Sequence, residues 1–483
     1  MEDKLKEYSL SKDYSISTYN DEQKRAIDIL VDFLNTPGTD FDYTLEGPGG
    51  SGKTTIIKDV LRFCKLGGKR CVTAPTHKAV RVIVKATGMT GNTIHKLLGL
   101  RPDVDLDNFD PNKPMFNPLG IPSMGDYSVI IVDEASMINK WLHARIIMTA
   151  KRTNTKVIFA GDDCQAPPVG EMLSLVFKSE RMVSLKCIMR QGDDHVLIPL
   201  LNVLRQDIKL GSSYFFSALR KAPKMEFERG GYYMQDGNNF VASMSAYFNE
   251  HEFERNIDFV RTTCFTNIAV AHWNGYVRKN LFPDVTEVLC KDDLLMSYST
   301  IVEKAGQDRI IEIMVNSEDY IIHEYSKYVN DQGLQGYLVS LQSVSTGETT
   351  PFMFILDHKH QPSVNRYADV LQAYINSANN ARTVVDRRLA WESYYKYRNK
   401  NLCMIDIYKS DGHTLLTSKD LDYGFAITVH KTQGSTYNNI FVDGNNIIYN
   451  KFNLPVKDIK LRNRLLYVAL SRPKENAFIN MNI

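Results

Sequence analysis

A glycine-rich loop at residues 47–55 holds the side chains best suited to chemistry in this chain. Its spacing is Gly-x4-Gly-Lys-Thr, and apolar-leaning stretches on both sides predict the order strand, loop, helix. Glycines let the backbone turn its N–H groups around an anion, and the start of a helix adds a positive dipole end. We therefore predict a nucleoside triphosphate site, with Lys53 reaching the β- and γ-phosphates and Thr54 holding Mg²⁺. The predicted nucleotide-binding residues of this loop are Gly47, Gly49, Gly50, Ser51, Gly52, Lys53, Thr54 and Thr55.

Two carboxylates stand at the end of a later apolar run, residues 129–132. Asp133 is placed to hold Mg²⁺, directly or through water, and Glu134 to orient and activate an attacking water. Alone, such a run marks only the end of a strand, but downstream of a phosphate loop it indicates catalysis. Gln23 lies in a predicted helix before the loop. It is either an ordinary solvated residue or an adenine ligand, because its amide both donates and accepts hydrogen bonds.

Alternating strands and helices must position these residues. Short apolar runs, each ending in a polar motif and followed by a helical pattern, predict an open parallel sheet with its site along the carboxyl edge. A second unit of this kind begins near residue 181, gives way to short alternating strands from about 286, and resumes at 424. The pattern of residues 366–400 predicts solvent-exposed helices with no single apolar face. Trp391, Tyr394 and Tyr395 are expected to pack these helices against another surface.

Length and composition set the frame. A chain of 483 residues is too long for one core, and 43% hydrophobic with 24% charged residues is typical of a soluble globular protein. The net charge of +2 neither supports nor excludes nucleic acid. Seven scattered cysteines without a Cys-x-x-Cys pair argue against zinc and disulfide frameworks and fit a reducing compartment. Residues 1–13 lack an apolar signal core and no run is long enough for a bilayer, so we expect a cytoplasmic protein with no membrane partner.

Taken in order, these motifs resemble those of superfamily 1B DNA helicases, in the Dda-, RecD- and Pif1-like group. The resemblance covers nearly the whole chain. Gln23 falls on the Q motif, the glycine-rich loop on motif I, and Asp133 with Glu134 on motif II. The further matches are residues 73–79 (motif Ia), 93–95 (Ib), 161–168 (III), 190 (IV), 264–267, 428–435 (V) and 467–472 (VI).

The resemblance implies an α/β fold with two RecA-like parallel-sheet domains. A small hairpin is inserted in the first, and an SH3-like β-barrel with a helical tower in the second. The expected ranges are 1–98 and 126–180 for the first RecA-like domain with the phosphate loop, 99–125 for the hairpin or pin domain, 181–285 and 412–483 for the second RecA-like domain, and 286–411 for the SH3-like domain with its tower at about 366–400.

The resemblance also assigns residues. Gln165 would sense the γ-phosphate, and Arg190 and Arg472 of the second domain would reach it on closure, with Gln433 and Gly434 also binding nucleotide. Either arginine alone would read as a surface cation. A DNA strand would be held through phosphate contacts. The matching positions are Pro75, Thr76, His77, Thr93, His95, Thr266, Asn267, His430, Lys431 and Thr432.

Alternatives stay open at several of these positions. His77 and His95 also fit structural residues at helix starts. Phe116 fits an apolar wedge that stacks on the terminal base pair, Phe109 competes for this role, and local packing is a third reading.

The function implied is an Mg²⁺- and ATP-dependent helicase that moves on single-stranded DNA, acts on forks and works as a monomer in replication, recombination or repair. Its 5′→3′ direction rests on the resemblance alone. A single-strand-binding protein or a replisome component is an expected partner, and the compartment would be the bacterial host cytoplasm for a phage-encoded chain. The alternatives are an RNA helicase, a nucleic-acid-stimulated ATPase that remodels protein–nucleic acid complexes, and a small-molecule P-loop kinase, in which motifs III, V and VI have no role.

Overall fold

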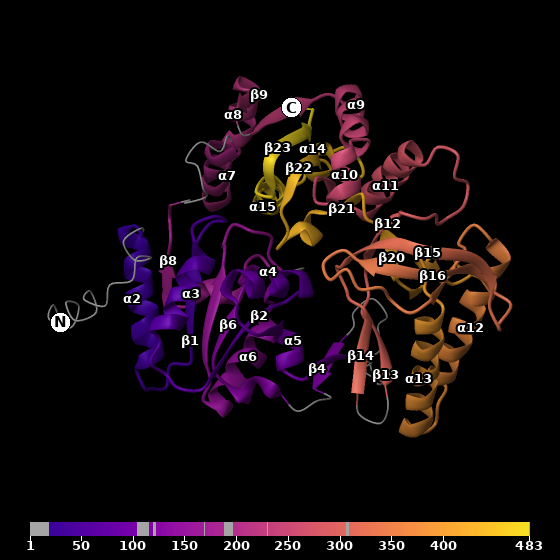
Figure 1. Ribbon diagram of the computed structural model, residues 1–483, viewed down its shortest axis with the longest axis horizontal. Helices are drawn as coiled ribbons and strands as arrows, with labels where there is room; N and C mark the ends of the chain where they lie inside the picture. Colours follow the sequence, from indigo (N-terminus) through magenta and orange to yellow (C-terminus); the bar gives the residue numbers. More distant parts are fainter. Residues whose placement is uncertain are drawn as a thin grey trace. The chain divides into compact units, whose positions relative to one another are not determined.

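The computed structural model describes residues 19–103, 115–118, 122–168, 170–187, 197–228, 230–305 and 309–482. These residues fall into two compact units, coloured along the chain in Figure 1. The first unit takes Met1–Pro75, Ala79–Leu98 and Ser123–His195. The second takes Val196–Ile483 together with two earlier segments, Thr76–Lys78 and Gly99–Pro122.

The first unit is built on a six-stranded sheet in which every described pairing is parallel. In spatial order its strands are β3 (Gly91–Thr93), β2 (Lys69–Ala74), β6 (Tyr127–Val132), β7 (Lys156–Gly161), β1 (Asp42–Glu46) and β8 (Met182–Ser184). All six residues of β7 are buried, as is typical of a parallel strand covered on both faces. The helices are α2 (Asp21–Asn35), α3 (Lys53–Phe63), α4 (His77–Thr87, whose first two residues group with the second unit), α5 (Ile94–Leu97) and α6 (Lys140–Thr153).

The observed boundary of the first unit differs from the predicted one. The sequence suggests that the second domain begins at 181, but Thr44, Leu45 and Glu46 of β1 pair in parallel with β8. The first unit therefore includes β8. A short edge strand gives no local sign of the sheet that it joins, because the pairing is decided by residues far away in the sequence.

The second unit contains another six-stranded sheet, parallel except at one edge. Its order is β21 (Ala426–Thr428), β11 (Val260–Cys264), β22 (Tyr437–Asp443), β23 (Pro473–Asn480), β10 (Gly230–Gln235) and the antiparallel β9 (Lys224–Phe227). The accompanying helices are α7 (Leu197–Leu210), α8 (Tyr214–Lys221), α9 (Gly237–Phe248), α10 (His251–Arg255), α11 (Asn267–Leu281), α14 (Gly444–Ile448) and α15 (Ile459–Leu470). Aromatic rings fill its core: Phe441 stacks on Phe478 with ring centroids 4.5 Å apart.

Between β11 and β21 the chain forms an antiparallel sheet of five strands. These are β17 (Met353–Leu356), β16 (Gln335–Ser343), β15 (Asp319–Val329), β12 (Leu294–Ser297) and β20 (Leu421–Tyr423), and a separate hairpin joins β13 (Ile301–Ala305) to β14 (Arg309–Met314). The predicted α/β class, with two parallel sheets and an antiparallel β insertion, is confirmed. Because β20 pairs with β12, this sheet extends beyond the predicted limit at 411.

Residues 366–400 form helices, but these helices have a buried side. Helices α12 (Gln361–Asn379) and α13 (Val384–Lys400) pack through an aromatic core in which Tyr367 stacks on Tyr397 at 5.5 Å. Trp391 and Tyr394 are 2% exposed, as the aromatic content suggests, whereas Tyr395 is only partly buried. The helical pattern is hard to see in the sequence because tyrosines, rather than aliphatic residues, mark the buried face.

The predicted hairpin at 99–125 is present as β4 (Leu100–Asp103) paired antiparallel with β5 (Met115–Pro118). It groups with the second unit, although in the sequence it interrupts the first. Among the described residues, no helix combines the length and apolarity needed to cross a membrane.

Candidate nucleotide site and nucleic-acid interface

The phosphate loop follows β1 and ends at Gly52, which caps α3 in a left-handed conformation with φ 85°. A Cβ atom at Gly52 would lie 2.7 Å from Nε2 of Gln23, so both conformation and space require glycine. At Gly49 a Cβ would meet nothing within 4 Å in the described part of the chain, so packing there does not require glycine. The absence of a side chain at Gly49 keeps the backbone open to a bound group.

Lys53 is the first residue of α3, and its ammonium lies across the loop that precedes it. Nζ donates to the carbonyl oxygens of Gly47 at 2.7 Å and Pro48 at 2.9 Å. The amide of Gly47 in turn donates to Gly161 at the end of β7, at 3.0 Å. The lysine is thus held inside a loop that is tied to the sheet edge.

Gln23 is not the solvated residue that its position allows. Its side chain is 4% exposed and makes a reciprocal capping box with Asn20 at the start of α2. Its Nε2 also donates to the carbonyl oxygen of Ser51 at 3.1 Å. The Gln23 amide therefore stabilises the phosphate loop through Ser51. Its predicted contact with an adenine base stays a prediction.

Asp133 and Glu134 follow β6, as predicted. Burial raises the pKa of the Asp133 carboxyl, opposed by the backbone N–H of Glu134, which donates to Oδ1 at 2.9 Å, and by the positive charge of Lys53. Glu134 has φ 51° and ψ 43°, a left-handed conformation that costs a non-glycine residue about 1–2 kcal/mol. Such strain gathers where a fold must aim a particular side chain, and here it falls on the predicted water-activating carboxylate.

Gln165 follows β7 and is buried, with 6% exposure. Its Oε1 accepts a hydrogen bond from the hydroxyl of Ser136, 3.5 Å away, which lies just past Glu134. In the sheet, β7 lies between β6 and β1, and parallel strands place their carboxyl ends at one edge. The first unit therefore gathers Lys53, Asp133 and Gln165 along a single edge.

Arg472, Gln433 and Gly434 lie together in the second unit. The Arg472 guanidinium is 7% exposed, with Nε donating to Val468 at 3.1 Å and Nη1 to Ser435 at 3.5 Å. Gly434 has φ 75° in the turn that leads to Ser435. These residues precede β22 and β23, so they stand at the amino edge of the second sheet.

Among the predicted DNA contacts of the first unit, Thr93 also has a role in local structure. Thr93 caps α5, its hydroxyl oxygen accepting from Lys96 N at 3.3 Å. His95 follows within α5 and is partly buried. Pro75 follows β2 in this unit, while Thr76 and His77 belong to the second unit and are partly exposed. A role of these residues in DNA binding stays a prediction.

In the second unit, Thr266, Asn267 and His430 meet at the opposite edge from Arg472, because they follow the parallel strands β11 and β21. Thr266 caps α11, and Asn267 is exposed. Burial lowers the pKa of His430, whose ring centroid lies 6.2 Å from that of Phe265. The neutral imidazole that this favours is suited to accept or donate a single hydrogen bond to a strand.

Lys431 and Thr432, the remaining predicted strand contacts, point their polar atoms into the protein. Thr432 is fully buried, and its hydroxyl donates to Val429 at 2.7 Å. Lys431 Nζ lies 4.1 Å from the ring centroid of Tyr298 and donates to the hydroxyl of Ser317 at 3.1 Å. Burial, with a smaller effect of Lys419, lowers the pKa of Lys431 to about 8.

Three predicted site residues lack described side chains. Arg190 and Phe109 lie outside the described residues, and for Phe116 the structure describes only the backbone, in β5 opposite Pro102. The roles of these residues as an arginine finger and as wedge candidates stay predictions.

Several residues that support the predicted site carry little or no signal in the sequence. Asn446, at the start of α14, accepts hydrogen bonds from the amides of Phe265 at 2.8 Å and Thr266 at 2.9 Å and so fixes the loop after β11. Ser136 contacts Gln165, and the hydroxyl of Tyr19 donates to Asp59 on α3 at 2.8 Å. Of these three residues, only Tyr19 could have been suspected from the sequence, because it lies close to Gln23. Asn446 stands 180 residues from Thr266, beyond any local pattern.

A protein-family model described as "AAA domain" matches residues 18–210. The chain is 23% identical to the ATP-dependent DNA helicase dda of Enterobacteria phage T4, over 94% of this chain and 98% of that protein. It is 32% identical to the ATP-dependent RecD2 DNA helicase of Deinococcus radiodurans, but over only 29% of this chain and 18% of that one. An uncharacterized protein of Methanocaldococcus jannaschii is 22% identical over 95% of this chain, which spans only 38% of that relative.

A solved structure of a Pif1 helicase from Bacteroides, in complex with ADP-AlF3 and single-stranded DNA, aligns with a TM-score of 0.47. It is 16% identical, and the alignment covers 96% of this chain and 92% of that chain. Two of these relatives, those from phage T4 and Deinococcus radiodurans, are described as ATP-dependent DNA helicases. The chain is thus similar, over nearly its whole length, to an ATP-dependent DNA helicase of the Dda type and, over a shorter part, to one of the RecD type.

Proposed function

We propose that this protein is an ATP-driven motor that moves along single-stranded DNA and opens the duplex ahead of it. The direction proposed is 5′→3′, the direction that the family resemblance implies. The observation that carries the proposal is the convergence of Lys53, Asp133 and Gln165 at one sheet edge, with the charge of Lys53 acting on Asp133. The phage relative, which is described as an ATP-dependent DNA helicase and matches over 94% of this chain, supports DNA as the substrate.

The residues present fit a triphosphate with Mg²⁺. The open space at Gly49 and the buried hydroxyl of Ser51, which has no hydrogen-bond partner among the described residues, are both features of a loop shaped for a further group. Lys53 would exchange its bonds to Gly47 and Pro48 for phosphate oxygens, and Thr54 and Asp133 would hold the metal. When bound, Mg²⁺ would neutralise charge on the phosphates.

The remaining residues divide the work of hydrolysis. Glu134 would orient the attacking water and accept its proton, and Gln165 would report the γ-phosphate. Arg472, with Gln433 and Gly434, would complete the charge stabilisation from the second unit, and Arg190 would supply a further positive charge. An arginine that arrives only on closure makes turnover depend on domain movement.

The DNA-handling parts of the proposal follow the family plan. The carboxyl edge of the second sheet, with Thr266, Asn267 and His430, would hold strand phosphates without reading sequence. The β4–β5 hairpin would be the pin, the five-stranded antiparallel sheet the SH3-like domain, and helices α12 and α13 the tower.

The test is the ATPase rate with and without single-stranded DNA, followed by unwinding of forks with a 5′ or a 3′ tail, made of DNA or RNA. We expect strong stimulation by single-stranded DNA and unwinding of DNA forks with a 5′ tail. Preference for RNA forks would favour the RNA helicase, and displacement of a bound protein without unwinding would favour the remodelling ATPase. Turnover that ignores nucleic acid would refute the proposal.

A further inference from the structure

Helix α6 of the first unit, labelled in Figure 1, has a buried side and an exposed side. Leu142, Ile146 and Ala150 recur at four-residue spacing and are buried, as expected for a face that packs on a sheet. Trp141 and Met148 lie on the other side, where they are 39% and 55% exposed. They are two turns of helix apart, so their side chains lie on one stripe of the surface.

The segment after β7 exposes another apolar side chain beside the first turn of α6. Glu171 Oε1 accepts from the backbone N–H of Lys140 at 2.9 Å. The hydroxyl of Ser174 donates to the carbonyl oxygen of Ile138 at 2.6 Å. These bonds hold the segment against the start of the helix, and Met172 within it is 82% exposed. We define the α6 face as the outer stripe of the helix together with this methionine, namely Trp141, Arg145, Met148, Lys151, Arg152 and Met172.

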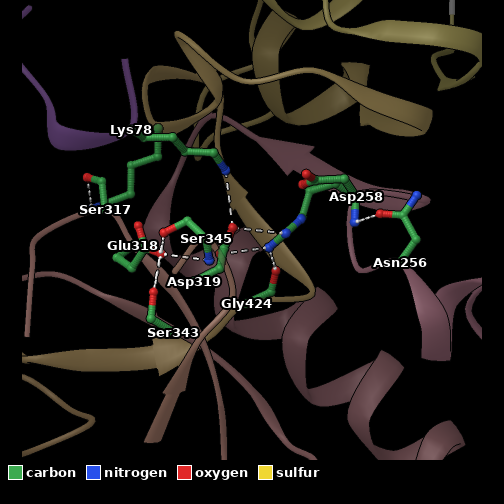
Figure 2. A network of polar contacts seen from close by, with 11 residues as sticks. Lys78, Asn256, Asp258, Ser317, Glu318, Asp319, Ser343, Ser345 and Gly424 are labelled. Carbon is green, nitrogen blue, oxygen red and sulfur yellow. Dashed lines mark hydrogen bonds and ion pairs between the residues drawn. The ribbon is translucent and has the colours of Figure 1, made fainter. Parts of the chain in front are cut away.

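Every charged side chain of α6 is basic, and the four are Lys140, Arg145, Lys151 and Arg152. None of them forms an ion pair with a carboxylate of the described residues. In the second unit, by contrast, Lys78 Nζ lies 3.1 Å from the carboxylate of Asp319 (Figure 2). The helix dipole favours cations in the last turn, but it does not explain exposed apolar side chains next to them. The α6 face is therefore both apolar and positively charged, with its charges available to another molecule.

Arg145 and Trp141 form a pair that is suited to recognise a carboxylate. The Arg145 guanidinium lies over the Trp141 ring, 5.3 Å from its centroid. This contact uses the flat face of the guanidinium, so its N–H groups stay in the plane where a carboxylate can accept two of them. The partly exposed indole ring offers an apolar surface beside the same carboxylate. Trp and Arg are also among the residue types that contribute most to binding at protein interfaces.

Charge and apolarity together select one kind of occupant for the α6 face. A second copy that docked through the same face would bring like charges together, because a symmetric interface meets itself. A nucleic acid strand would pair its phosphates with the cations, but exposed methionines have no partner in a phosphate backbone. An acidic protein segment that carries apolar side chains satisfies both, and flexible methionines adapt their shape to such a partner.

We propose that the α6 face is a docking site for an acidic, amphipathic segment of a partner protein. From Trp141 to Arg152 the helix rises by about 16 Å, so one short segment covers the stripe. The apolar side chains of the segment pack on Trp141, Met148 and Met172, and its carboxylates pair with the basic residues of the face. The face contains none of the predicted nucleotide or DNA contacts, so docking can be tested separately from ATP hydrolysis.

The test uses the full-length protein and a fluorescein-labelled synthetic peptide in which Phe and Leu recur at helical spacing among Asp and Glu. Fluorescence anisotropy gives the Kd across a salt series. The wild-type protein should bind the peptide, and the Kd should rise with salt because exposed charge pairs are screened. Arg145→Glu should raise the Kd by about tenfold or more, and Met172→Ser by about threefold. Failure of the wild type to bind, or unchanged Kd values in both variants, would overturn the proposal.

Tryptophan fluorescence reports on the α6 face directly. The chain has three tryptophans, and Trp273 and Trp391 are buried, with 7% and 2% exposure. Acrylamide should therefore quench mainly Trp141, and saturating peptide should lower the quenching constant by about twofold or more because an interface excludes solvent. Peptide that binds without protecting Trp141 occupies another surface, and this result would also overturn the proposal.

Matched control variants come from helix α4 of the same unit. Lys85→Glu changes the net charge as Arg145→Glu does, and Val82→Ser removes an exposed apolar side chain as Met172→Ser does. Both controls should bind the peptide like wild type. Arg145→Glu should keep the wild-type ATPase rate and Tm, and if it does not, Met172→Ser decides the outcome because its side chain is almost fully exposed.

Three further measurements separate the other occupants. A peptide with Ser in place of Phe and Leu should bind about tenfold more weakly, and equal binding would reduce the effect to diffuse charge attraction. Oligo-dT should not protect Trp141 from acrylamide, because protection would assign the face to nucleic acid. Sedimentation velocity should show no dimer that Arg145→Glu dissociates, because such a dimer would assign the face to a second copy. Any of these contrary results would overturn the proposal.

Discussion

Replacing Gly52 by alanine should destabilise the first unit by an amount that the local geometry sets. The residue has φ 85°, which costs alanine about 1–2 kcal/mol. The new Cβ would also lie 2.7 Å from Gln23 Nε2, and Gln23 is held by Asn20 and Ser51, so it cannot move without losing a hydrogen bond of about 1 kcal/mol. The sum is about 2–3 kcal/mol, or a fall in Tm of about 4–12 °C.

Differential scanning fluorimetry of Gly52→Ala and Gly49→Ala gives the comparison. Gly49 has open space and no left-handed φ, so Gly49→Ala should keep its Tm within about 2 °C of wild type while weakening ATP binding. In a Gln23→Ala background, the clash between the new Cβ and the glutamine side chain disappears. Gly52→Ala should then lower the free energy of unfolding only by the cost of the left-handed backbone. Equal Tm values for Gly52→Ala and wild type, or equal losses at both glycines, would refute the reasoning.

The other predictions concern the catalytic residues, a buried lysine and the hairpin. Lys53→Ala should abolish phosphate release while oligo-dT binding, measured by anisotropy, is mostly retained; undiminished turnover would remove Lys53 from the site. Glu134→Gly should abolish turnover without loss of Tm, because relief of about 1–2 kcal/mol of strain offsets the greater freedom of the unfolded glycine, about 0.5–1 kcal/mol. Burial holds the pKa of Lys431 at about 8, below the unfolded value of about 10.4, so the unfolded chain binds the extra proton between these values. The free energy of unfolding, measured by urea denaturation, should therefore increase from about pH 8 to about pH 10, by at most about 1.4 kcal/mol per pH unit. In Lys431→Met this increase should be absent. Phe116→Ala should reduce fork unwinding more than DNA-stimulated ATPase, and equal losses in both would identify Phe116 as a packing residue.

Much of the candidate site could be predicted from the sequence because its determinants are local. The phosphate loop needs glycine at Gly52, a cation at Lys53 and a strand before them, all within a few residues. The apolar run before Asp133 predicts a buried strand, and Asp133 stands at its carboxyl end. Thr93 caps α5 through an amide only three residues away. Such features follow from backbone geometry and from hydrogen bonds between residues that are close in the sequence, so a short stretch of sequence is enough to predict them.

The pairing of distant groups was decided by the tertiary structure alone. A local pattern marks Gln23 as a helix residue, and only folding buries its amide against the phosphate loop. Lys431 reads as a phosphate contact, but the fold directs its ammonium to Ser317 and Tyr298. No spacing rule brings Lys78 to Asp319, because they are 241 residues apart. The sequence by itself determined which residue types stand at each strand end, whereas the fold decided which charges are neutralised within the protein, because burial and pairing depend on neighbours that the chain order does not reveal.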